Sequence, residues 1–441
     1  MASAGLLCLL LAAVETPLTL PEAIAKAERA NPELLAARER AVAQDLRGEA
    51  AGRARWPRLS LRSGLSRTDQ PSWVFAQTLD AGEFTQENFA IERLNAPASL
   101  SHLTTTLALE APLDVFGKLG DQAEGQRSLG RTAGAIADEA RLEIRARVVE
   151  AYHRAALARR AAEVTERALA GARAREGDVE ARVTEGAALT ADLLRARARR
   201  RQREAVLAER RGDAAVAGAA LARLLGAAPG EAYAPADEAS APAALAKDEA
   251  ALAAEALADR PAVRAAQERL AALQRSARGE DRAPLPDLVA WGQLQDDRNS
   301  FSNGGQSYAV GLQLRWNALD AGRGRRQAAA AAEVRAAEQD ARAAADQVRL
   351  EVATAYRRAL TARERHAAAA GGAAEGREAL RVVQERHRAG RATLTDELET
   401  EAASLEAELQ EVAAAAEVAI ADAALARATG NSHGDGETQG N

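Results

Sequence analysis

Proline placement is the feature that most constrains how this chain can fold. All 13 prolines of the 441 residues lie between Pro17 and Pro286, and none occurs from Leu113 to Ala228. Because proline in a helix interior costs about 3 kcal/mol, the two long proline-free tracts, rich in alanine and charge, predict very long helices. Such helices need lateral partners, since helix propensity by itself stabilises them little.

Composition supports a helical chain and argues against several classes of protein. Hydrophobic residues make up 47% of the chain and charged residues 28%, whereas aromatic residues make up only 3%. That mixture is typical of long helices or coiled coils, and it is too poor in aromatic side chains for a conventional α/β enzyme core. The net charge of −6 and the lack of a basic stripe with interleaved aromatics argue against nucleic-acid binding.

The sequence has no recognisable pattern for catalysis, a cofactor or a metal. None of the five histidines is spaced with a second histidine or a cysteine as a metal site requires. Phosphate loops, nucleotide fingerprints and nucleophile elbows are also missing. We therefore expect no cofactor and no enzyme.

The amino terminus predicts a signal peptide over residues 1–14. Its apolar run, Ala4–Val14, is too short to span a bilayer as a helix and fits the hydrophobic region of a secretory signal. No Lys or Arg precedes the run, so a disordered start is the alternative. Cys8 is the only cysteine, and its removal with the signal would exclude disulfides and thiol catalysis. Lipidation of Cys8 is disfavoured, because Leu7 stands where a small residue is needed.

An internal repeat divides the chain into two similar parts. Asn31-Pro32 and Trp56-Pro57 recur 229 positions later as Arg260-Pro261 and Leu285-Pro286. Further along the chain the offset falls to about 204, so the first copy contains extra residues. The pattern predicts a duplicated unit. We expect a first repeat at 15–230, a linker at 231–247, a second repeat at 248–430 and a disordered tail at 431–441.

Each copy also contains one β-like segment. The first copy predicts a hairpin at about 57–113, with a long loop at about 69–102 between its strands. The second predicts a hairpin at about 286–317, in which apolar residues alternate with small or polar ones. The alternating residues of its last strand are Tyr308, Val310, Leu312, Leu314 and Trp316.

The length of these strands, nine to eleven residues, is that of transmembrane β-strands. Soluble hairpins that cap the helices are the alternative. Four strands per chain cannot close a barrel, because the smallest membrane barrels need about eight. Open sheet edges in lipid would leave unpaired backbone groups that cost several kcal/mol each. If the strands span a membrane, several chains must share one barrel, and three chains would supply twelve strands.

Taken in order and in duplicate, the motifs of this chain resemble those of the TolC family of outer-membrane efflux proteins. The segments that carry the resemblance are Leu18–Ile24, Asn31–Leu34, Trp56–Leu59, Ala111–Gly117 and the two Gly-x5-Asp stretches that start at Gly186 and Gly390. The resemblance implies a mainly α protein with a membrane β portion. Its duplicated helical hairpins would form a trimeric α-barrel in the periplasm, and its strands would form a shared twelve-stranded barrel in the outer membrane.

The resemblance also implies a function and a set of partners. A homotrimer embedded in outer-membrane lipid would carry substrates across the periplasm and the outer membrane. An inner-membrane pump of the RND or ABC type would deliver the substrates through a periplasmic adaptor. The alternative is a soluble periplasmic coiled-coil scaffold or adaptor. The cargo, whether a drug, a metal ion or a protein, and the pump type are left open.

The two Gly-x5-Asp stretches predict turns between long helices, which the family places at the periplasmic tips. An ordinary helix–helix turn is the alternative. The residues expected at the tips and in contact with the adaptor are Gly186, Thr190, Leu193, Leu194, Gly390 and Leu394. Packing within the hairpins is an equally good explanation for the leucines.

Three acidic residues correspond to the periplasmic aperture of the family. Asp396 and Glu399 match the positions that form a constricting ring, and Asp192 matches a position that links hairpins in the closed state. Three copies of such carboxylates around a narrow axis would attract cations. A solvated helix face is the alternative. The family's usual basic and aromatic partners are replaced by Ala392 and His387, which leaves the closing link in doubt.

Overall fold

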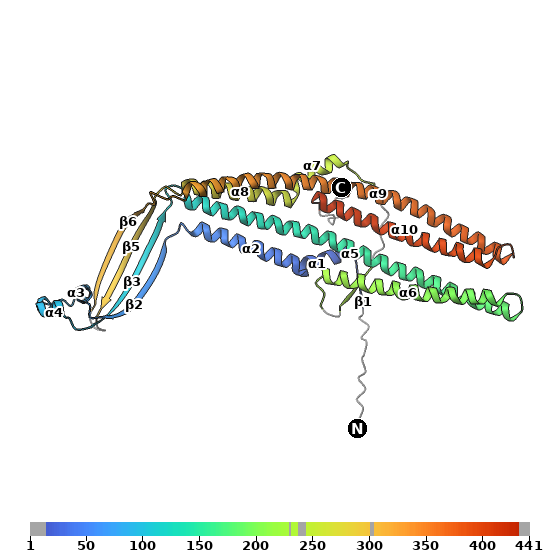
Figure 1. Ribbon diagram of the computed structural model, residues 1–441, viewed down its shortest axis with the longest axis horizontal. Coiled ribbons are helices and arrows are strands. Elements are labelled where there is room, and N and C mark those ends of the chain that lie inside the picture. The colour runs from blue at the N-terminus through green and yellow to red at the C-terminus, as the bar shows by residue number, and fades with distance from the viewer. Residues whose placement is uncertain (1–14, 229–230, 237–243, 300–303, 432–441) are drawn as a thin grey trace, which may run out of the picture. The chain divides into compact units, whose positions relative to one another are not determined.

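The protein is described here by a computed structural model, which covers residues 15–228, 231–236, 244–299 and 304–431 (Figure 1). The expected signal peptide, most of the expected tail and part of the expected linker lie outside these residues. The elements in chain order are β1 (Glu15–Leu18), α1 (Leu20–Ala30), α2 (Pro32–Arg53), β2 (Arg58–Thr68), α3 (Pro71–Asp80), the 3-10 helix η1 (Gln86–Phe89), α4 (Ile91–Asn95), β3 (Leu100–Leu113), α5 (Lys118–Thr184), α6 (Thr190–Leu224), β4 (Ala232–Pro235), α7 (Glu249–Asp259), α8 (Pro261–Arg282), β5 (Asp287–Arg298), β6 (Gly305–Arg315), α9 (Arg323–Arg388) and α10 (Leu394–Thr429).

The chain forms two compact units, and each repeat contributes to both. The first, which we call the helical unit, comprises the chain up to Ala41, Ala133–Ala266 and the chain from Ala341. The second, which we call the sheet unit, comprises Val42–Thr132 and Gln267–Asp340.

Two long helical hairpins, α5–α6 and α9–α10, dominate the helical unit (Figure 1). The prediction of very long helices is confirmed, because α5 contains 67 residues and α9 contains 66. Ion pairs join the two helices of each hairpin and also join α5 to α10. Examples are Arg200–Glu176 between α6 and α5, Arg363–Asp422 between α9 and α10, and Arg167–Glu408 between α5 and α10.

Each repeat packs its own core in the helical unit, and the two cores use equivalent residues. In the first core, Ala27 and Leu34 pack with Val148 and Leu221. The second core contains their counterparts at the same offsets as the sequence repeat: Ala256, Val263, Val352 and Leu425. These residues are alanines, valines and leucines, so both cores are built from aliphatic side chains. The repeat in the sequence therefore corresponds to a repeat in the packing of the two cores.

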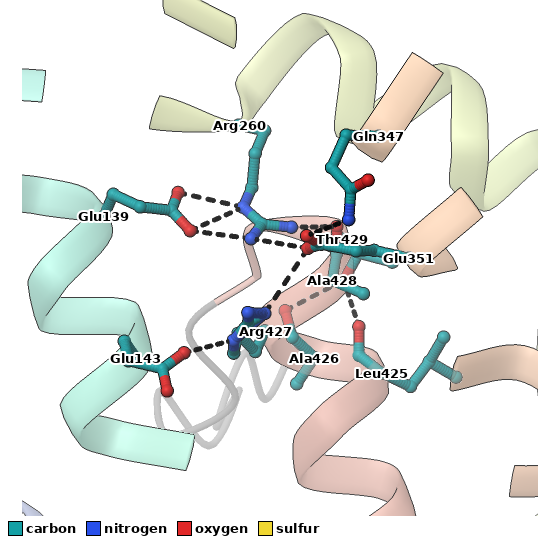
Figure 2. Close-up of polar contacts among 10 residues, drawn as sticks. All are labelled: Glu139, Glu143, Arg260, Gln347, Glu351, Leu425, Ala426, Arg427, Ala428 and Thr429. Carbon is teal, nitrogen blue, oxygen red and sulfur yellow. Dashed lines mark hydrogen bonds and ion pairs between the residues drawn. The ribbon is translucent and has the colours of Figure 1, made fainter. Parts of the chain in front are cut away.

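The residue before the helix-starting proline closes each core in a different way. In the first repeat, the buried Asn31 donates from Nδ2 to the carbonyl oxygen of Leu224 (2.8 Å). In the second, Arg260 donates from Nη1 to the carbonyl oxygen of Ala428 (2.8 Å), the equivalent of Leu224, and also binds Glu139 and Glu351 (Figure 2). Both side chains satisfy a carbonyl at the end of the last helix of their repeat, where no intrahelical donor remains.

The charged partners of Arg260 come from both long helices, Glu139 from α5 and Glu351 from α9. Arg260 Nη2 lies 2.6 Å from Glu139 Oε1 and 3.0 Å from Glu351 Oε2. Burial lowers the pKa of Arg260 and the two carboxylates raise it, and the net effect is upward. Arg427 extends the cluster by binding Glu143 at 2.5 Å and Glu351 at 3.4 Å.

The sheet unit contains one antiparallel sheet in the order β2-β3-β5-β6, so the hairpins of the two repeats lie next to each other. The expected pairings are confirmed by the register. In the first hairpin, Leu59 pairs with Leu109 and Leu61 with Leu107, and in the second, Leu294 pairs with Tyr308. The strand expected to end at Trp316 ends at Arg315.

The connection between β2 and β3, expected as a long loop, is instead largely helical. We call residues 69–99 the cap; it contains α3, η1 and α4. Pro71 occupies the first turn of α3, where its missing N–H and fixed φ suit a helix start. The rings of Phe75 and Phe84 pack edge to face with centroids 4.7 Å apart, and Phe84 packs likewise on Phe89 at 5.1 Å. The three rings therefore form one aromatic cluster within the cap.

The segment 231–247, expected as a linker, contains the short strand β4. It pairs in parallel with β1 at the start of the first repeat, and Tyr152 donates its hydroxyl to the carbonyl oxygen of Leu18 (2.9 Å). The pairing of β1 with β4 thus joins the start of the first repeat to the segment that follows it.

Replacing Arg260 should destabilise the helical unit. Removing one partner of a buried ion pair costs about 3–5 kcal/mol, and we expect Arg260→Met to fall at the lower end, because Glu139 and Glu351 are each about a quarter exposed. Arg264→Met is the matched control, since Arg264 pairs with Asp138 at the surface, where such pairs contribute about 0–1 kcal/mol. The thermal midpoint of helical circular dichroism in detergent should fall for the first variant only. Equal midpoints would contradict the role of Arg260.

Candidate functional site

One face of the sheet is apolar and exposed. The predicted residues of β6 lie on it, with exposures of 78% for Tyr308, 76% for Val310, 69% for Leu312 and 60% for Leu314. The register places further leucines on the same face, namely Leu59, Leu61, Leu65, Leu107, Leu109 and Leu294. Trp316, just beyond the strand, is also exposed and donates from Nε1 to the carbonyl oxygen of Pro284 (2.9 Å). An exposed apolar area of this extent marks a surface for lipid or for a partner.

The opposite face of the sheet is mostly polar. Its residues include Ser60, Arg62, Ser66, Thr104, Thr106, Gln293, Gln295 and Gln313. The sheet is therefore amphipathic, with a period of two along every strand.

None of the described helices combines the length and the apolar composition that crossing a bilayer requires.

Both long hairpins turn at the glycines that the sequence indicated. Gly186 and Gly390 adopt left-handed conformations, with φ of 74° and 68°, which glycine reaches without the steric cost of a Cβ. In each turn the following residue closes the helix end: the N–H groups of Ala187 and Arg391 donate to the carbonyls five residues back, both at 2.7 Å. The two tips have the same backbone design, which is a common way to end a helix.

Asp396 has a structural role at the second tip. It accepts hydrogen bonds at Oδ2 from Thr393 Oγ1 (2.7 Å) and from the Thr393 backbone N–H (2.9 Å). In return, its own N–H donates to Thr393 Oγ1 (3.1 Å), which completes a capping box at the start of α10. The hydrogen bonds from the Thr393 side chain and backbone lower the pKa of Asp396. Its exposed carboxylate is therefore charged at neutral pH.

Asp192 occupies the equivalent position at the first tip but has a different partner. The N-cap residue there is Leu189, which has no side-chain acceptor, and Asp192 instead pairs with Arg195 one turn further on, at 3.2 Å. Glu399 is exposed on α10. The three expected aperture acids therefore lie at the two tips, and Asp192 and Asp396 hold matching positions on their helices.

The leucines expected to contact an adaptor differ in exposure. Leu193 is buried at 8%, whereas Leu194 is 59% exposed. Thr190 is exposed and Leu394 is half-buried. Leu189, which the sequence reasoning did not single out, is 70% exposed. In this chain Leu193 packs within the hairpin, and the exposed apolar surface of the first tip comes from Leu189 and Leu194.

A charged cluster between the hairpins was missed by the sequence reasoning. Arg175 on α5 pairs with Glu397 at 3.2 Å and with Glu401, both on α10. His387 Nδ1 lies 3.0 Å from the carbonyl oxygen of Ala392, so it is tied to its own tip turn. The spacing of Glu397 and Glu401 puts both on one helix face, but nothing local in the sequence identifies Arg175 as their partner. Among the described residues, no three His, Cys, Asp or Glu side chains gather as metal ligands.

Comparison with known proteins gives one family match. Residues 252–431, which include most of the second repeat, match the family model described as Outer membrane efflux protein. This part of the chain is similar to the outer membrane efflux protein family. The resemblance noted in the sequence is thereby confirmed, and the first repeat extends it as a copy of the matched part.

Solved structures share the fold of this chain over nearly its whole length. The Campylobacter jejuni CmeC outer membrane channel has a TM-score of 0.80 and 16% identity, over 93% of this chain and 85% of that one. The Neisseria gonorrhoeae MtrE outer membrane channel has a TM-score of 0.75 and 20% identity, over 93% and 89%. The outer membrane protein VceC from Vibrio cholerae has a TM-score of 0.74 and 20% identity, over 93% and 96%. No curated protein matches the chain in sequence.

The matched family model and the fold shared with outer membrane channels both point to an efflux channel of the outer membrane with an extension into the periplasm. They do not favour a soluble scaffold or adaptor. The amphipathic sheet fits this location, because lipid requires one apolar face.

Removing the cap of α10 should loosen the second tip. We expect Thr393→Ala to cost about 1 kcal/mol of local stability, because the first N–H groups of α10 lose their acceptor. Amide hydrogen exchange of residues 394–398 should speed up, and Thr395→Ala, in the same turn and exposed, serves as the control. Unchanged exchange in the Thr393 variant would show that the capping box does not hold the tip.

Proposed function

We propose that three copies of this chain share one twelve-stranded barrel and conduct substrates that an inner-membrane pump delivers through a periplasmic adaptor. The single observation that carries the proposal is the four-stranded amphipathic sheet. In the described part of the chain, β2 and β6 each pair on one side only. In lipid the unpaired backbone groups would cost several kcal/mol each, and pairing β6 of one copy with β2 of the next removes both edges.

Two further features support a passive channel. The first tip exposes Leu189 and Leu194, a small apolar surface of the kind that a helical adaptor covers. Asp396 and Glu399 supply exposed carboxylates at the second tip, so three copies would place a negative ring around the axis. No catalytic step is part of the proposal. A pump of the RND or the ABC type fits it equally well.

Charges on the apolar face should prevent membrane assembly. Val310→Arg with Leu312→Arg places two cations where lipid would be, at about 2–4 kcal/mol each near the middle of the bilayer. Gln313→Arg is the control, because Gln313 lies on the polar face of the same strand. The amount of trimer in outer-membrane fractions should fall sharply for the first variant and stay near wild type for the second. Normal assembly of the double variant would contradict a lipid-facing role.

Neutral residues at the second tip should change conduction. Asp396→Asn with Glu399→Gln removes two charges per copy and retains an acceptor for Thr393, so the tip remains capped. In planar bilayers the variant should conduct more current, and multivalent cations should block it less. Glu417→Gln, an exposed position further along α10, is the control. Wild-type conductance and block would reject the ring.

A further inference from the structure

Helix α3 of the cap lies at the end of the sheet where β2 ends (Figure 1). Gln77 donates from Nε2 to Ser66 Oγ on β2 (3.3 Å). At the other side of the sheet, a Cβ on Gly305 of β6 would overlap the carbonyl oxygen of Asp80, so the end of α3 touches the backbone of β6. By the alternation of the strands, Ser66 and Gly305 both belong to the polar face. The helix therefore reaches from the first strand of the sheet to the last.

A buried polar cluster lies in the same end of that face. His102 on β3 is 3% exposed, and its Nε2 lies 2.9 Å from Oδ1 of Asp297 on β5, which is 2% exposed. Asp297 also accepts from Thr104 Oγ1 (2.9 Å) and from Gln295 Nε2 (2.7 Å). Polar groups on this face would be in water without a cover, so their burial shows that the cap shields them.

Asn299 connects this cluster to the cap. Its Oδ1 lies 2.7 Å from His102 Nδ1, and its Nδ2 lies 3.1 Å from Glu83 Oε2 and 3.4 Å from the carbonyl oxygen of Gln77. The identified attachments of the cap to the sheet are thus hydrogen bonds. Each contributes only about 0.5–1.5 kcal/mol net, because water can replace it.

The cap is held together by different forces from those that attach it. Its aromatic rings pack on one another, and the capping interaction of Thr85 with Asn88 fixes η1. Arg67 at the end of β2 donates to Ser99 Oγ at the end of the cap (3.1 Å), so the two ends of the cap are pinned close together. A segment with packed aromatic rings, neighbouring ends and polar attachments can leave the sheet as one body.

We propose that the cap is a lid over the outer exit of the channel, resting on the polar face and leaving it when the exit opens. The inference rests on the proposed trimeric barrel, in which the polar face lines the lumen. Three caps, one from each copy, would then lie across the inner wall at the exit. The second repeat has no equivalent, because only residues 299–304 connect β5 to β6.

The lid is tested by the access of a bulky reagent to the lumen from outside. Ser60→Cys places a reporter on the polar face near the far end of β2 from the cap, and Cys8→Ala in every variant removes the only native cysteine. A polymer-linked maleimide that the outer membrane excludes is added to intact cells. With the lid in place, we expect slow labelling of the reporter.

Gly305→Ala should displace α3 and speed the labelling by several-fold, because the added Cβ would overlap Asp80. His102→Ala should also speed the labelling, because it removes the hydrogen bond to Asn299, which binds the cap. This variant remains informative if Gly305→Ala misfolds. Gly64→Ala is the control: it adds the same methyl group on the polar face, where nothing lies within 4 Å. Equal labelling rates in all variants would contradict the lid. Fast labelling of Ser60→Cys in a protein with the wild-type cap would contradict it as well. Loss of trimers from native gels would instead count against the proposed barrel.

Discussion

Backbone hydrogen bonding at the two outer strands is the constraint on which the rest of this structure depends. A four-stranded sheet with one apolar face can be stable in lipid only if no strand edge is open, and within the described residues β2 and β6 each have one. In the proposed trimer, closure by further copies satisfies the edges and gives the polar face a water-filled interior. The long helices also need lateral partners, because helix propensity by itself stabilises them little.

Duplication supplies the four strands economically, and it also shows where the two repeats have diverged. The cores retain equivalent aliphatic residues, such as Leu34 and Val263 or Val148 and Val352. The residue before the helix-starting proline differs between the two repeats. Asn31 caps its helix and binds one carbonyl, whereas Arg260 makes the same carbonyl contact and also joins α5 to α9 through Glu139 and Glu351. Arg260 therefore couples a long helix of the first repeat to one of the second by charge.

Much of this architecture could be predicted from the sequence because its signals are periodic and local. Proline-free tracts predicted α5 and α9, and alternation predicted the two β-hairpins. Gly186 and Gly390 predicted the turns of the long hairpins. Arg175 with Glu397 could not be found, because a contact between residues so far apart leaves no local pattern. Leu193 was ambiguous for a related reason, since a leucine at a helical tip fits packing and contact equally well.

The cap shows what a loop can do once the faces of a sheet are assigned. Only the structure shows that its three phenylalanine rings pack on one another and that hydrogen bonds attach it to the sheet. Had the apolar side been turned to the sheet, the segment would be a permanent part of the core. With hydrogen bonds there instead, the closed and open arrangements differ by interactions that water can replace, which is the balance that a movable element needs.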